Sequence, residues 1–92
     1  MQEKNSKRTK IWLRTVDGDE KILKEKVYEY TGDTMPAFLE ELRRVCEELD
    51  EATPVVLRSH YNNFKQFNVV RFAPRDFVEY VYFEKMILEY VK

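Results

Sequence analysis

The sequence predicts an α+β fold made of two β-hairpins, each followed by a helix, in the order ββαββα. Three observations predict this order. Residues 10–16 are rich in strand-forming side chains and precede an Asp-Gly pair. Residues 35–51 carry apolar side chains at helical spacing, and residues 54–61 and 66–73 are two further strand-like segments. We expect both helices to pack on one face of an antiparallel sheet, because each element must bury an apolar face.

The first hairpin is predicted from the turn at Asp17-Gly18. Glycine accepts the positive φ that two-residue hairpin turns require, so this pair is a strong signal for a turn between two strands. The return strand covers residues 20–30, whose apolar side chains alternate imperfectly between the two faces. The sequence therefore leaves the register of this hairpin open.

The first helix is predicted over residues 35–51 from a single apolar stripe. The members of the stripe recur three and four residues apart: Met35, Phe38, Leu39, Leu42, Val45, Cys46 and Leu49. Thr34 or Asp33 can cap the helix at its beginning. The opposite face is charged, and Glu40 and Arg44 have the spacing of an i,i+4 ion pair.

The second half of the chain is predicted as a hairpin and a helix. Residues 54–61 and 66–73 form the two strands, and residues 62–65 connect them. Residues 75–90 contain no Gly, Pro, Asn, Ser or Thr and exceed the usual strand of about five or six residues, which favours a helix. Residues 77–83 are nevertheless rich in strand formers, so the segment is ambiguous between helix and strand.

Length and composition indicate one domain. The chain has 92 residues, of which 43% are apolar and 36% are charged. We expect residues 10–92 to form the domain and residues 1–9 to form a flexible basic tail, because that segment has little to bury. The single cysteine, Cys46, excludes an intramolecular disulfide and fits a reducing compartment. The sequence shows no secretory signal and no long apolar run, so we expect a cytoplasmic protein.

The sequence contains no catalytic or metal-binding signature. His60 is the only histidine, and in a strand its neighbour Ser59 would face the other side of the sheet, which separates base from nucleophile. Cys46 lies on the apolar stripe of the first helix, where a thiol behaves as a small hydrophobe. Two glycines are too few for a loop that cradles phosphate. We therefore expect a protein that is not an enzyme and binds no metal or cofactor.

Charge is distributed unevenly along the chain. Residues 33–51 hold seven acids and two arginines, whereas residues 54–75 hold four cations and no acid. Cations interleaved with aromatic and amide side chains suit phosphates and stacked bases. The candidate binding surface consists of Arg58, His60, Tyr61, Asn62, Asn63, Lys65, Arg71 and Arg75. In the competing, structural interpretation the arginines simply pair with the acidic helix.

The sequence favours a small, non-enzymatic interaction module that binds another protein or associates with itself. Trp12 and the tyrosines of residues 80–90 are side-chain types that are enriched at protein interfaces. A C-terminal helix that is apolar nearly all round would suit a homodimer. The alternative is a nucleic-acid-binding accessory protein that uses the acid-free hairpin of residues 54–75. No membrane and no small-molecule cofactor is expected as a partner.

Overall fold

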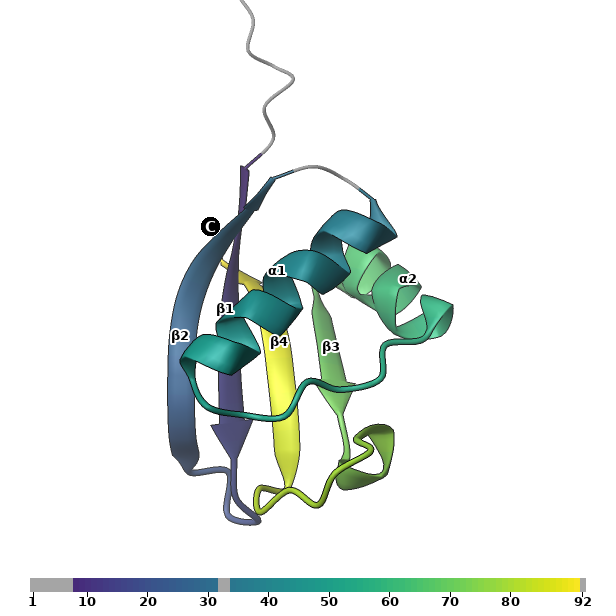
Figure 1. The fold of residues 1–92 in the computed structure, drawn as a ribbon. Helices are drawn as coiled ribbons and strands as arrows, with labels where there is room; N and C mark the ends of the chain where they lie inside the picture. Colours follow the sequence, from purple (N-terminus) through teal and green to yellow (C-terminus); the bar gives the residue numbers. More distant parts are fainter. Residues whose placement is uncertain (1–7, 32–33, 92) are drawn as a thin grey trace, which may run out of the picture.

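A computed structural model of the chain describes residues 8–31 and 34–91, except for the side chain of Arg8. Four strands form one antiparallel sheet in the order β2-β1-β4-β3: β1 (Arg8–Val16), β2 (Ile22–Thr31), β3 (Val69–Phe72) and β4 (Lys85–Val91). Two helices, α1 (Met35–Glu48) and α2 (Arg58–Phe67), follow β2 in the chain. In Figure 1, α1 crosses in front of the sheet and α2 lies beside β3. The α+β class is therefore confirmed, but the element order is ββααββ instead of ββαββα.

The first hairpin forms as predicted, although its turn depends on a carboxylate. Asp17 Oδ1 accepts the backbone N–H groups of Asp19 and Lys21 at 2.8 and 2.9 Å. The positive φ in the turn, 67°, belongs to Glu20 and not to Gly18. The Asp-Gly pair thus predicts the place of the turn correctly, but the role assigned to its glycine is wrong.

The apolar stripe forms α1. Thr34 caps the helix, since its Oγ1 accepts the backbone N–H of Ala37 at 3.3 Å. The helix ends before residue 51 because the backbone becomes left-handed at Asp50, which has a φ of 58°. Beyond that reversal, the N–H of Glu51 donates to the carbonyl of Cys46 at 2.8 Å and closes the helix end.

Residues 54–73 fold as a helix and a strand instead of a hairpin. α2 takes the place of the end of the first expected strand, of the whole connection and of the first two residues of the second expected strand. Tyr61 and Phe64 lie on one face of α2, and their rings each approach the ring of Phe38 in α1 with centroids 5.4 Å apart. The left-handed asparagine is Asn68, with a φ of 65°, which caps the end of α2 immediately before β3. Helical packing against α1 therefore overrides the strand-like pattern.

The C-terminal segment is a strand where a helix was expected. A short 3-10 turn, η2 (Pro74–Asp76), and an irregular segment precede β4. β4 lies between β1 and β3, so it has a hydrogen-bonding neighbour on each side. Three consecutive residues of β4 are buried, namely Met86, Ile87 and Leu88. The segment is apolar because it forms a central strand that is covered on both faces, and not because it forms a helix that is buried all round.

One hydrophobic core connects the sheet to both helices. The sheet contributes Ile11, Leu13, Tyr28, Tyr30, Val70, Phe72, Met86 and Leu88. Phe38 is fully buried among them, together with Leu42, Val45 and Cys46 of α1. Neither α1 nor α2 is long and apolar enough to cross a membrane, and these are the helices of the described residues. Residues 1–7 of the expected tail lie outside the described part of the chain, and residues 8 and 9 belong to β1.

Candidate binding surface beside α2 and β3

The structure divides the predicted surface between core and solvent. Tyr61 is buried against Phe38, so its place in the predicted surface is wrong. His60 is half-buried. The other predicted members are exposed: Arg58, Asn62, Asn63, Lys65, Arg71 and Arg75. They come from α2, β3 and η2, which were not the elements expected to carry them.

His60 supports the local fold. Its Nδ1 accepts the backbone N–H of Leu57 at 2.9 Å, which caps the beginning of α2. Its ring centroid lies 4.7 Å from that of Phe72 in β3. Its Nε2 faces Asp76 Oδ1 at 4.0 Å. Both ring nitrogens are thus directed at other groups, and neither is available to activate the neighbouring Ser59.

Asp76 joins the segments that surround this histidine. Its Oδ2 accepts the backbone N–H of Ala73 at 2.8 Å, just after β3. Its carbonyl accepts the backbone N–H of Val55 at 2.7 Å, from the segment that leads into α2. Together with the approach to His60, these bonds tie the start of α2 to the end of β3.

The arginines of α1 are paired within their own helix. Arg43 pairs with Glu40 and Glu47, both at 3.2 Å, and Arg44 pairs with Glu41 at 2.7 Å and Glu48 at 2.6 Å. The expected pair between Glu40 and Arg44 is therefore wrong, because each arginine uses other neighbours on the helix. Lys26 of β2 also reaches Glu48, at 3.4 Å. The acidic helix thus draws its counter-charges from α1 and β2, and the structural interpretation of the 54–75 arginines is wrong.

The arginines of residues 58–75 have no counter-charge among the described residues. Arg58, Arg71 and Arg75 are exposed, and no ion pair or hydrogen bond joins their side chains to any residue in the described ranges. Arg14 of β1, by contrast, pairs with Glu89 at 3.1 Å. Among the described residues, the arginines without an ion pair therefore all lie between residues 58 and 75.

A groove of about 350 Å³ lies between α2 and β3. Three side chains of α2 and three residues of β3 line it: His60, Asn63, Phe67, Val69, Val70 and Arg71. The ring of Phe67 is 60% exposed, which makes it the main apolar side chain offered to a ligand there. The predicted surface omitted Phe67, because its helical spacing from His60 and Asn63 matters only once α2 is known to be a helix.

The outer edge of β3 presents backbone groups that β4 does not use. The N–H of Tyr90 donates to the carbonyl of Asn68 at 2.8 Å, at the point where β3 begins. Hydrogen-bonded pairs alternate along an antiparallel ladder. The N–H and C=O groups of Val69 and Arg71 therefore point away from β4, and no other described residue bonds to them.

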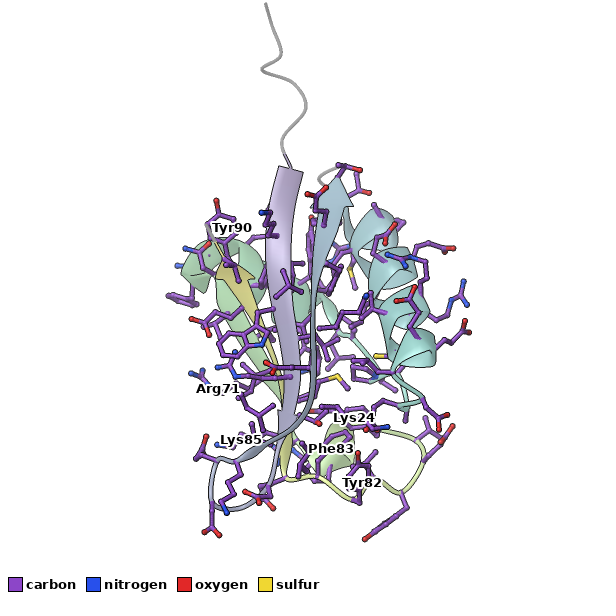
Figure 2. The ribbon with its side chains drawn as sticks, turned by 90° about the vertical axis from the view of Figure 1, so that its left-hand side faces the viewer. Lys24, Arg71, Tyr82, Phe83, Lys85 and Tyr90 are labelled. Carbon is purple, nitrogen blue, oxygen red and sulfur yellow. The ribbon has the colours of Figure 1, made fainter. Side chains whose placement is uncertain are left out.

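The sheet face away from α1 carries some paired side chains and also Arg71, which has no ion pair or hydrogen bond to a described residue. Trp12 Nε1 donates to Glu25 at 2.9 Å, and the guanidinium of Arg14 lies 3.9 Å from the Trp12 ring centroid. Figure 2 shows Arg71 and Lys85 on this side of the sheet, opposite to α1. Arg71 therefore lies where the groove meets the open face of the sheet.

A second exposed feature is the segment between η2 and β4. Val78 is 88% exposed and Tyr80 is 92% exposed. Tyr82, near the same end of the molecule as Phe83 in Figure 2, donates its hydroxyl to Glu51 at 2.5 Å, and this bond raises the pKa of Tyr82 to about 12. The segment is thus anchored at Tyr82 and offers two apolar side chains to solvent.

Comparisons of the chain with protein-family models, with curated proteins and with solved structures find no match. Within residues 8–31 and 34–91, no three His, Cys, Asp or Glu side chains converge as ligands for a metal ion.

Proposed function

We propose that this protein is a non-enzymatic interaction module that binds an acidic segment of another protein on the side formed by α2 and β3. The observation that carries the proposal is a set of three exposed arginines without an ion pair or hydrogen bond to any residue in the described ranges: Arg58 in α2, Arg71 in β3 and Arg75 in η2. Of the three, Arg71 lines the groove. The fold pairs Arg14, and the two arginines of α1, with its own carboxylates. Cations that the fold leaves unpaired are available for charge-assisted hydrogen bonds to a partner.

Burial of the aromatic side chains favours a protein over a nucleic acid as the partner. Single-stranded nucleic acids bind by stacking their bases on exposed rings. Of the aromatic residues between 54 and 75, Tyr61, Phe64 and Phe72 are buried and Phe67 alone is exposed. The nucleic-acid alternative therefore depends on charge, and a few cations give weak, salt-sensitive binding.

The two candidate reactive side chains support a role without catalysis. His60 has both ring nitrogens directed at Leu57 and Asp76. Cys46 is fully buried, and this burial raises the pKa of its thiol to about 11, which keeps it protonated near neutral pH.

Site-specific photocrosslinking tests the proposal. Benzoylphenylalanine at position 63, in place of Asn63 in the groove, should give a protein adduct in cells of the source organism. The matched control carries the same group in place of Asp19, which is exposed in the turn between β1 and β2. Arg71→Glu added to the first variant should abolish the adduct. An adduct with nucleic acid would favour the alternative, and equal adducts at both positions would contradict the proposal.

A further inference from the structure

We infer that the groove between α2 and β3 takes an extended segment of the partner as an added strand, in which acidic and apolar residues alternate. This inference rests on the proposed function and specifies the mode of binding. Three features carry it: the unused backbone groups of β3, the two kinds of side chain that flank them, and the length of β3.

The backbone of β3 supplies the hydrogen bonds. Val69 and Arg71 each direct one donor and one acceptor away from β4. An extended peptide that lies along this edge completes the ladder, which is the general mode of strand addition. The opposite edge, β2, is less suited, because Lys24 reaches across to the carbonyl of Leu49 at 2.8 Å and Lys26 to Glu48. Charged side chains that point inward from an edge strand are a common protection against pairing with another strand.

The side chains beside β3 differ on its two sides. An added strand directs successive side chains to opposite faces. On the face toward α2, they would meet Phe67 and the ring of His60, which suits an apolar side chain. On the face of the sheet opposite to α1, they would lie beside Arg71. The guanidinium of Arg71 has no ion pair with a described residue, so it suits a carboxylate. The alternation of acidic and apolar residues follows from these two environments.

The length of β3 sets the length of the added strand. The four residues of β3 span about 13 Å at the rise of a strand. An extended chain of about four or five residues covers this length.

Charge excludes a second copy of this chain as the occupant of the edge. A twofold, antiparallel pair of β3 strands would place the two Arg71 side chains within two positions of each other on the same face. Arg58, which is exposed on α2 and has no ion pair to a described residue, would add further positive charge from both copies. A nucleic acid lacks the peptide amides that a backbone ladder requires. An acidic peptide satisfies both the charge and the ladder.

A fluorescein-labelled peptide with alternating residues, Glu-Val-Glu-Leu-Glu-Val-Glu, serves as the probe in anisotropy titrations of the full chain. We expect saturable binding that Arg71→Glu weakens about tenfold or more, since that change removes a charge-assisted hydrogen bond and adds repulsion. Lys21→Glu is the matched control, because it makes the same change of charge in the turn between β1 and β2, at the other edge of the sheet. It should alter the affinity by less than about twofold, since exposed charges far apart are screened by salt. Circular dichroism of each variant confirms that it is folded.

Two N-methylated forms of the probe test the backbone ladder. One is methylated at the amides of its glutamates and the other at the amides of its apolar residues. Alternate amides of an added strand face β3, so one form should lose binding and the other should keep it. Loss for both forms or for neither would overturn strand addition.

A scrambled probe with its glutamates grouped together tests for binding by charge alone. Equal affinity for the scrambled and the alternating probe would overturn the inference. If the alternating probe does not bind while crosslinking at position 63 still captures a protein, strand addition fails and the proposed function stands. Failure of the crosslinking as well would remove both.

Discussion

Replacement of Phe38 by alanine should remove the side chain that joins both helices to the sheet. Phe38 is fully buried, and its ring centroid lies 5.8 Å from that of Tyr30 in β2 and 5.4 Å from those of Tyr61 and Phe64 in α2. Truncation of a buried phenylalanine costs about 3–5 kcal/mol of unfolding free energy. Ring pairs of this geometry contribute about 0.5–1.5 kcal/mol each beyond area burial, so we expect the upper part of that range. A domain of this length has a total stability of about 5–14 kcal/mol.

Urea unfolding followed by circular dichroism measures this loss. Phe38→Leu keeps most of the apolar volume and should lose less, which provides a measurement if the alanine variant does not fold. Val27→Ala is the control, because Val27 is 52% exposed on β2 and its truncation should change stability by less than about 0.5 kcal/mol. A loss below about 1.5 kcal/mol for Phe38→Ala would refute the assignment of this ring to a core shared by both helices.

Three further predictions follow from single side chains. Iodoacetamide should modify Cys46 slowly near neutral pH in the folded protein and rapidly in urea, because burial raises the pKa of this thiol; equal rates would contradict the burial. The backbone N–H groups of Lys21 and Asp19 lower the pKa of Asp17, so its carboxylate stabilises the fold above its ordinary pKa of 3.8 and loses this effect as the pH falls through the lowered value. Urea midpoints of Asp17→Asn should therefore vary less with pH below about 4 than those of the wild type, and parallel curves would count against this turn. If the exposed side chains of Val78 and Tyr80 mediate self-association, light scattering should give a dimer mass at high micromolar concentration, and serine at both positions should give a monomer; a monomeric wild type would contradict the homodimer.

Local patterns were sufficient for the first half of the fold. The stripe from Met35 to Leu49 defines α1 because its spacing alone sets which side chains share a helical face. The turn at Asp17 depends on bonds to residues two and four positions away, so its place is also a local property. Register was not local: the bulge between Thr15 and Val16 shifts the pairing, and it exists only where both strands meet.

Two segments in the second half of the chain have a different secondary structure from the one that their sequence predicts. Val55 and Val56 are strand formers, and only the N-cap residue Leu57 separates them from α2, whose ten residues contain no β-branched side chain. At residues 86–88, β4 is buried on both faces and so lacks the alternation of a surface strand. In both cases, contacts with other segments decide the secondary structure. These contacts come from Phe38 for α2 and from the two flanking strands for β4.

The candidate surface shows the same division. The sequence alone determined that residues 54–75 hold cations without acids, and that no catalytic or metal-ligand pattern accompanies them. Only the tertiary structure decided that Tyr61 faces the core, that Phe67 lines a groove, and that no described strand pairs with the outer edge of β3. Composition and helical spacing are properties of neighbouring residues, whereas burial, pairing and strand order depend on contacts between segments far apart in the chain, and these form only when the core closes.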